Sequence, residues 1–209
     1  MFNHSHLPNP GLTSGMIPPE IYQALHKEIV DINTNDHGIQ KMNEVLAGQI
    51  TKEYEITKSR QLLDPYLEDM ARAYQKNWDY LGDVSSPKEN PNKNDLKVES
   101  VWVNMQKKSE VNPLHNHDGT LSFVAWLHVP FKLEDERNME YCKKSRTEIL
   151  TSTFQFVYNT TVGTIANYPL FVEEGWEGRI IMFPAKLLHM VYPFQTSDDY
   201  RISIAGNLH

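Results

Sequence analysis

The sequence has a single cysteine, Cys142, among 209 residues. One cysteine cannot form an intramolecular disulfide, which excludes a disulfide-stabilised secreted scaffold and a cysteine-based zinc finger. The sequence also lacks any apolar run near the roughly 20 residues that a membrane span needs. Its start, MFNHSHLPNPGLTSG, has neither the basic nor the apolar region of a signal peptide. These absences predict a cytoplasmic protein with no membrane partner.

Basic residues are in deficit, since 20 Lys and Arg stand against 27 Asp and Glu, a net charge of −7. A net acidic chain is poorly suited to bind a phosphate backbone, which disfavours nucleic acid as a partner. A chain of this length can bury one sizeable core, so we expect one domain over residues 1–209. The sequence leaves the oligomeric state open and allows a homodimer.

The first part of the chain has apolar residues at helical spacing. Three helices are expected, from Pro18 to Ile32, from Ile39 to Ile50 and from Asp64 to Gly82. In the third, Asp64 would be the N-cap, Pro65 the first helical residue and Gly82 the C-terminal stop. Residues 1–16 are rich in Pro, Asn, Gly and Ser and are expected to form an irregular arm.

From residue 98 onward the period of the apolar residues changes to two, which is typical of strands. Strands are expected at 101–106, 121–129, 154–158, 179–183, 189–192 and 201–208. Helices followed by many short strands predict a mostly β protein, a jelly roll or double-stranded β-helix. Residues 98–209 would form the jelly-roll core, and residues 1–97 an arm and supporting helices packed outside it.

A His-x-His motif, His115-Asn116-His117, carries the clearest chemical information. In an extended strand, residues two apart share a face at roughly 6–7 Å, so the two imidazoles would converge on one point. That is the geometry of a chelating metal site. The third ligand must come from elsewhere, and His189, which follows a strand ending at Pro184, is the best candidate.

Arg201 lies on the last expected strand, where alternation places it on the same face as Ser203. A planar guanidinium beside a hydroxyl can hold a carboxylate through two parallel hydrogen bonds. If Arg201 faces the interior, it needs an anionic partner. A ligand carboxylate would satisfy it. The alternative is a structural ion pair with Asp198, Asp199 or Glu173.

Three segments together resemble a known family. They are PLHNHDGTLSFVAWLHVP, EGRIIMFPAKLLHMVYPF and YRISIAGNL. In this order they resemble the Fe(II)/2-oxoglutarate-dependent oxygenases of the double-stranded β-helix superfamily, in particular a His-x-His family common in marine bacteria and phages. The resemblance covers residues 98–209. It implies a non-haem Fe(II) dioxygenase that uses O2 and 2-oxoglutarate to hydroxylate a small molecule or peptide. A phage-encoded member would act in the host cytoplasm.

The resemblance implies roles for individual residues. His115, His117 and His189 would bind the iron, and Arg201 with Ser203 would hold the distal carboxylate of 2-oxoglutarate. Asn104, a weaker candidate, would also face this cosubstrate. Trp102 and Trp126 would line the pocket.

The motif departs from the wider superfamily, whose first ligand pair is His-x-Asp or His-x-Glu. Here no Asp lies two residues after a His. Either His117 replaces the carboxylate, or Asp118 reaches the metal from a bulged strand. The argument from strand faces favours His117.

Two other functions are compatible with the sequence. The first is a cupin-like metalloprotein, a dioxygenase or isomerase that uses three histidines and no 2-oxoglutarate. Residues 118–133 contain no Glu, however, and so lack the glutamate of cupins. The second is a non-catalytic jelly-roll binding module, which leaves the three histidines and Arg201 unexplained. Substrate specificity is expected in loops at 131–150 and 159–177.

Overall fold

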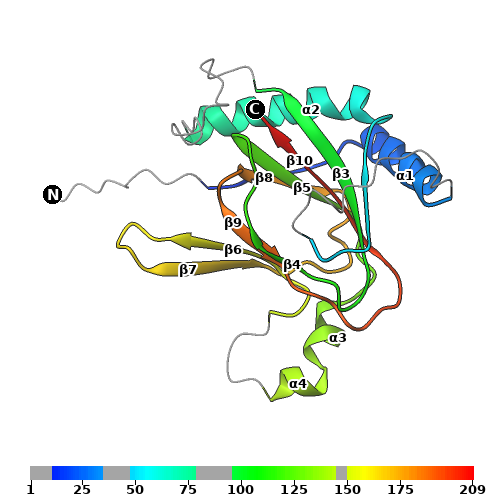
Figure 1. Ribbon diagram of the computed structural model, residues 1–209, viewed down its shortest axis with the longest axis vertical. Coiled ribbons are helices and arrows are strands. Elements are labelled where there is room, and N and C mark those ends of the chain that lie inside the picture. Colours follow the sequence, from blue (N-terminus) through cyan, green and yellow to red (C-terminus); the bar gives the residue numbers. More distant parts are fainter. Residues whose placement is uncertain (1–10, 35–47, 79–95, 145–149) are drawn as a thin grey trace.

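Two antiparallel sheets face each other in the computed structural model, which describes residues 11–34, 48–78, 96–144 and 150–209 (Figure 1). The larger sheet has the strand order β1-β8-β5-β10-β3-β2. Its strands are β1 (Thr13–Met16), β2 (Lys52–Glu55), β3 (Val98–Gln106), β5 (Leu121–His128), β8 (Arg179–Pro184) and β10 (Arg201–Leu208). The smaller sheet has the order β4-β9-β6-β7. Its strands are β4 (Asn112–His115), β6 (Phe154–Asn159), β7 (Ile165–Leu170) and β9 (Leu188–Val191). The jelly-roll prediction is confirmed.

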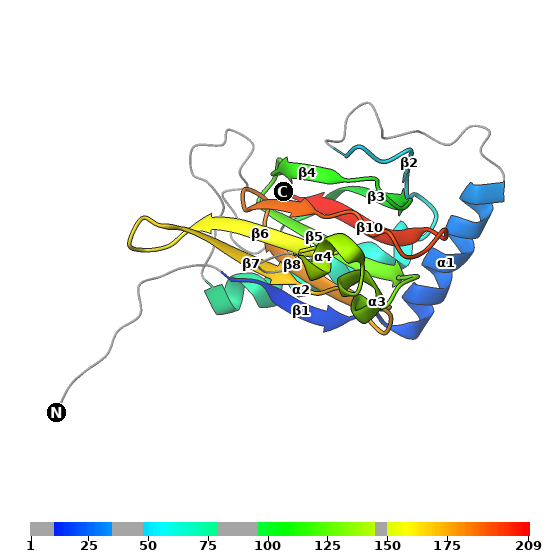
Figure 2. The same ribbon diagram turned by 90° about the horizontal axis from the view of Figure 1, so that it is seen from below.

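Two long helices, α1 (Pro19–Thr34) and α2 (Arg60–Trp78), pack on the outer face of the larger sheet (Figures 1 and 2). Their apolar stripes, with Leu25 and Leu67 fully buried, share one core with Val103 and Ile204 of the sheet. The predicted helical layer outside the β core is therefore confirmed. None of the helices in the described part of the chain has the length and apolar character to cross a bilayer.

A second core fills the space between the two sheets. It is built from aromatic residues, with Trp126 and Phe183 on the larger sheet and Phe154 on the smaller one. The rings of Trp126 and Phe154 meet edge to face at 6.1 Å between centroids. Two short helices, α3 (Leu133–Arg137) and α4 (Glu140–Lys143), lie in the first of the two predicted loops, and β7 lies in the second.

The start of α2 was predicted wrongly, because the helix begins at Arg60 and contains Pro65 in its interior. Asp64 is not the N-cap: it binds Arg60 in an ion pair at 2.8 Å, one turn along the helix. The turn that leads into the helix is held by Glu28 on α1, whose carboxylate accepts hydrogen bonds from the backbone N–H groups of Thr57, Lys58 and Ser59 at 2.7, 2.8 and 2.7 Å. A contact supplied from another helix leaves no local pattern in the sequence.

Other differences concern the segment before residue 98. Part of the expected irregular arm is the strand β1, which pairs with β8, and β2 pairs with β3. Most of the expected helix from Ile39 to Ile50 lies outside the described residues, as does Gly82. At its end, Gln49 forms a β-bridge with Val111 and is not helical.

The hydrogen bonds that the Glu28 carboxylate accepts lead to a prediction about stability. Burial raises the pKa of Glu28, but hydrogen bonds from Ser59, Thr57 and Lys58 outweigh it and hold the pKa below its usual value. We expect Glu28→Gln to lower the free energy of unfolding by about 2 kcal/mol at neutral pH, since charge-assisted hydrogen bonds are lost. A carboxylate with a lowered folded pKa stabilises the fold above its unfolded pKa and loses this effect as the pH falls through the folded pKa. The difference between variant and wild type should therefore shrink in acid.

Urea unfolding at several pH values measures this difference. Glu20→Gln is the matched control, because Glu20 is exposed on the same helix, and it should change stability by no more than about 0.5 kcal/mol. Equal effects of the two variants would contradict the stabilising role of the Glu28 hydrogen bonds.

Candidate metal centre

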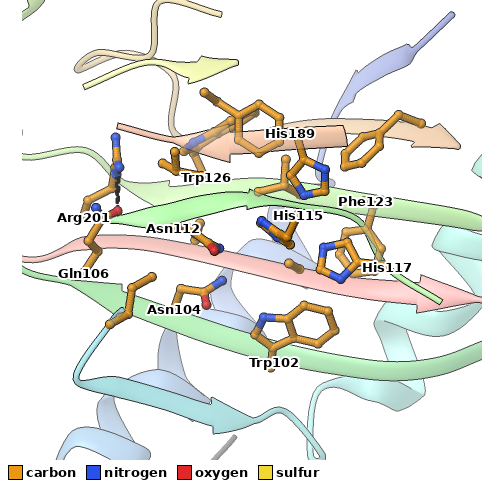
Figure 3. Close-up of a pocket in the computed structure, with 17 residues that line it drawn as sticks. Trp102, Asn104, Gln106, Asn112, His115, His117, Phe123, Trp126, His189 and Arg201 are labelled. Atoms are coloured by element: carbon orange, nitrogen blue, oxygen red, sulfur yellow. Dashed lines mark hydrogen bonds between the residues drawn. The ribbon is translucent and has the colours of Figure 1, made fainter. Parts of the chain in front are cut away.

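Three histidines converge at one end of the space between the sheets (Figure 3). His115 ends β4 and is the cross-strand partner of His189 on β9, while His117 follows two residues after His115. Their nearest ring nitrogens all lie within 4.8 Å of one another. Zinc and related ions bind imidazole nitrogen at about 2.0–2.1 Å, so small side-chain rotations would bring all three nitrogens onto one ion. The structure thus brings together the three residues predicted as ligands.

Backbone carbonyls orient two of the rings. Nδ1 of His115 donates to the carbonyl of Pro113 at 2.6 Å, and Nδ1 of His189 donates to the carbonyl of Leu187 at 2.9 Å. A proton held on Nδ1 leaves Nε2 with its lone pair directed toward the cluster, which is how metal-binding histidines are held. Phe154 stacks on His189 at 5.3 Å between centroids and fixes that ring further.

The three imidazoles are neutral at physiological pH. Burial lowers the pKa of His117 to about 3, with repulsion from His115 as a second cause. Burial also lowers the pKa of His189 well below its usual value, and lowers that of His115. Since a metal binds the neutral form, these ligands need no deprotonation.

Metal affinity should therefore depend little on pH. We expect the affinity for Co(II), used as an air-stable substitute for Fe(II), to change by less than about threefold between about pH 8 and pH 6. Three histidines with ordinary pKa values of about 6.5 would instead lose about 60-fold, because all three must be neutral at once. Calorimetric titration at the two pH values distinguishes these outcomes, and a loss near 60-fold would contradict the low pKa values.

Asp118, the alternative ligand, lies away from the cluster. Its side chain is 80% exposed and faces Lys186, with 3.3 Å between Oδ1 and Nζ. The backbone N–H of the preceding residue, His117, donates to the carbonyl of Ala185 at 2.9 Å, which holds the strand end in place. The geometry places His117, and not Asp118, with the other two histidines.

The histidines form one end of a pocket whose other end is polar (Figure 3). At that end lie Arg201 and Gln106, and the side chains of Asn104 and Asn112 lie between the two ends. As strand alternation predicts, Arg201 and Ser203 line the same pocket. Its walls include both predicted tryptophans, Trp102 and Trp126, with Ile50, Phe123, Val124, Phe154, Phe183, Val191 and Ala205.

Arg201 is buried, with 3% of its surface exposed. Its Nε and Nη2 both donate to Oε1 of Gln106, at 3.0 and 2.5 Å. Nη1 donates to the carbonyl of Ser152 at 2.7 Å, and Nη2 to that of Tyr192 at 3.0 Å. These acceptors are all neutral, so the guanidinium charge has no directly bonded anion among the described residues.

None of the three acids considered as structural partners of Arg201 forms an ion pair with it. Asp198 pairs with Lys108, Asp199 lies beside His128, and Glu173 accepts from the N–H of Leu133. Burial lowers the pKa of Arg201 to about 9, and the negative charge of Glu136 opposes this shift. Arg201 therefore keeps its positive charge at neutral pH.

Glu136 on α3 is a buried residue that the sequence did not reveal. It is fully buried, and its carboxylate accepts from Gln195 N–H at 2.9 Å, Thr196 N–H at 2.7 Å and Thr151 Oγ1 at 2.9 Å. These segments adjoin the carbonyls that bind Arg201, so Glu136 fixes the surroundings of the guanidinium. In sequence it stands in the charged run Glu134–Arg137, which gives no indication of burial.

The middle of the pocket offers polar atoms to a ligand. Oδ1 of Asn104 is buried and has no hydrogen-bond partner, and the same holds for Oδ1 of Asn112. Buried amides without partners are rare, and a bound polar group would satisfy them. Ser122 and Asn207, which lie in the segments that carry the family resemblance, form a hydrogen bond with each other: Ser122 Oγ donates to Asn207 Oδ1 at 2.7 Å.

Comparison with known sequences gives one family. The family model described as "Putative 2OG-Fe(II) oxygenase" matches residues 100–207, about half of the chain. No curated protein matches the sequence.

Solved structures share the fold at low sequence identity. A Pseudomonas putida prolyl-4-hydroxylase is 12% identical, with a TM-score of 0.55 over 95% of this chain and 92% of that one. A Trichoplax adhaerens prolyl hydroxylase, solved with a peptide fragment, is 9% identical with a TM-score of 0.51, over 94% and 82% of the two chains. The alpha ketoglutarate dependent carbocyclase of nogalamycin biosynthesis is 11% identical with a TM-score of 0.54, over 94% and 78%. At these identities the likeness concerns the fold alone.

Proposed function

Because the chain belongs to the 2OG-Fe(II) oxygenase family, we propose that it is a non-haem Fe(II) dioxygenase that couples decarboxylation of 2-oxoglutarate to hydroxylation of a second substrate. One observation carries this proposal: a pocket with three neutral, convergent imidazoles at one end and a buried, unpaired arginine charge at the other. A metal ion and a dicarboxylate together would satisfy both ends.

In this proposal His115, His117 and His189 hold the iron through their imidazoles. The set fits an ion, because the nitrogens converge and the rings are neutral. Three neutral ligands leave the ion's charge uncompensated, which favours chelation by an anion. When bound, iron with O2 supplies the oxidation that yields succinate, CO2 and a hydroxylated product.

Arg201 attracts the distal carboxylate of 2-oxoglutarate by its charge and donates to it, with the Ser203 hydroxyl as a second donor. Gln106 and the carbonyls of Ser152 and Tyr192 hold the guanidinium at a fixed place. Asn104, whose buried oxygen has no partner, lies between Arg201 and the histidines, where its amide would contact the body of the cosubstrate. Rotation of the amide would present its NH2 to an anionic oxygen.

The pocket walls would exclude water from the reacting groups. Trp102 is 3% exposed and packs against His117 at 5.5 Å between ring centroids. Trp126, 2% exposed, covers the opposite wall with Phe154. Water exclusion strengthens the electrostatic interactions of Arg201 with a ligand, because the local dielectric is low.

Succinate formation tests the proposal. The protein with Fe(II), 2-oxoglutarate and O2 would be assayed over a panel of peptides and small metabolites, since the structural relatives include a prolyl hydroxylase solved with a peptide fragment and a carbocyclase of nogalamycin biosynthesis. The expected result is succinate formation that depends on Fe(II), on 2-oxoglutarate and on one class of substrate. Oxygen consumption with a substrate but without 2-oxoglutarate would favour the cupin-like enzyme. Failure of Fe(II) and Mn(II) to raise the melting temperature would favour a binding module, because a ligand of the native state must stabilise it.

A further inference from the structure

A second hollow lies outside the pocket described above. It is bordered by β1, an edge strand of the larger sheet, and β7, an edge strand of the smaller one (Figure 2). Its volume is about 410 Å³, within the range of about 300–1,000 Å³ that is usual for ligand sites. We call it the edge groove.

The two sheets are joined differently at their two sides. On the far side, the N–H of Gln49 donates to the carbonyl of Val111 at 2.9 Å and links the segments that lead into β2 and β4. In the described part of the chain, no hydrogen bond joins β1 to β7, and each pairs with only one neighbour. Each strand therefore has one side without a partner strand, although the Met16 carbonyl of β1 already accepts from the Tyr66 hydroxyl at 3.1 Å and Pro169 of β7 has no N–H to donate. A free edge recognises an extended chain through main-chain hydrogen bonds.

The groove also exposes apolar side chains. Met16 on β1 is 59% exposed and Tyr168 on β7 is 51% exposed. The floor is formed by Leu170, Ile181 and Trp176, and the Trp176 ring packs edge to face on Trp126, 5.2 Å away, which belongs to the wall of the metal pocket. An extended peptide directs alternate side chains to one side, so its apolar residues can contact this floor while the intervening residues face solvent.

Arg179 supplies a charge at the groove. It is exposed, and its guanidinium lies over the Trp176 ring, 5.1 Å from the centroid. No ion pair of Arg179 occurs among the described residues. The carboxylates of its own loop are occupied elsewhere, Glu173 by the N–H of Leu133, Glu174 by Lys132, and Glu177 by the N–H groups of Val129 and Gly175. A stacked arginine loses little freedom on binding a carboxylate.

We propose that the edge groove docks an extended peptide that carries an acidic residue next to alternating apolar residues. The main chain of the peptide pairs with the edge of β1 or β7, its apolar side chains contact Trp176 and Tyr168, and its carboxylate binds Arg179. The charge favours this partner, because Arg179 is exposed and has no ion pair within the described part of the chain. The site is independent of the metal chemistry, so its test measures binding and not turnover.

Selection from a random dodecapeptide phage library against the full-length protein tests the proposal. Enriched peptides should contain an acidic residue beside alternating apolar ones. Synthetic copies should bind at least tenfold more weakly to Arg179→Glu, whereas Arg137→Glu should change binding by less than twofold. Arg137 is a matched control because it is also exposed and stacked on a ring, that of Phe171, but lies outside the groove.

Two further measurements complete the test. Replacing the acidic residue of the peptide with lysine should restore binding to Arg179→Glu, and bound peptide should slow amide exchange in β1 or β7. The proposal is overturned if no peptide is enriched, if enriched peptides bind Arg179→Glu as well as wild type, or if the slowed amides lie elsewhere. Binding of small aromatic acids without any peptide binding would also overturn it and would mark the groove as a small-molecule site.

Discussion

The His189→Ala protein is expected to lose metal-dependent decarboxylation of 2-oxoglutarate by at least about 1,000-fold. His189 is 3% exposed and lies against both other histidines, at 4.3 and 5.0 Å between ring centroids. Removing even a group that only orients a metal ligand weakens metal binding by about 10–100-fold, and removing a ligand should weaken it further. The remaining pair, His115 and His117, belongs to one short segment and cannot enclose an ion. Co(II) titration and succinate formation measure the two losses.

His128→Ala is the control for this variant. His128 stands on β5 with its side chain 40% exposed, near Asp199, so its loss should leave metal affinity and turnover within twofold of wild type. Circular dichroism establishes that both variants are folded. Metal binding by folded His189→Ala with wild-type affinity would show that the ion binds elsewhere.

Arg201→Gln is expected to weaken 2-oxoglutarate binding by about 30–100-fold, the equivalent of about 2–3 kcal/mol for a lost charge-assisted hydrogen bond. Metal affinity should stay within about threefold, because Arg201 lies at the opposite end of the pocket from the histidines. Among the described residues that line this pocket, Arg201 is the only arginine or lysine, and the substitution removes its charge. Calorimetry with Co(II)-loaded protein measures the affinity for 2-oxoglutarate without turnover.

The same substitution should also destabilise the fold by about 2–4 kcal/mol, since Gln106 and the carbonyls of Ser152 and Tyr192 lose their donor. Urea unfolding separates this structural effect from the loss of ligand affinity. Arg137→Gln, at an exposed arginine, should change neither quantity appreciably. A destabilised Arg201→Gln that still binds 2-oxoglutarate like wild type would show that Arg201 has only a structural role.

The convergence of His115 and His117 was predictable because it depends on short-range geometry: residues two apart in an extended segment share a face, although His117 lies just past the end of β4. His189 joins them through the pairing of β9 with β4. The alternation of β10 likewise predicted that Arg201 and Ser203 share a face, and both line one pocket with Asn104 of β3.

The surroundings of Arg201 were not predictable. Its hydrogen-bond partners come from positions 106, 152 and 192, and Glu136 acts on it from α3. Each of these contacts depends on tertiary packing and not on the strand that carries Arg201. For the same reason the start of α2 was misplaced: the turn before it is bound by Glu28, about thirty residues away in sequence.

The two short edge strands β1 and β2 were also not predictable from the sequence. β1 and β2 have only four residues each, too few to show a clear alternation of apolar and polar residues. Their pairing with β8 and β3 is decided by the free edges of a sheet formed mainly by later residues. The edge groove beside β1 could therefore not be foreseen from the sequence.

The most direct test of the central claim is spectroscopic. Wild-type protein is loaded with Fe(II) under anaerobic conditions and titrated with 2-oxoglutarate. The proposed pocket predicts a weak visible charge-transfer band that saturates with 2-oxoglutarate and is absent in His189→Ala. No band at saturating 2-oxoglutarate, with iron demonstrably bound, would contradict the claim that these histidines and Arg201 assemble one site for iron and its cosubstrate.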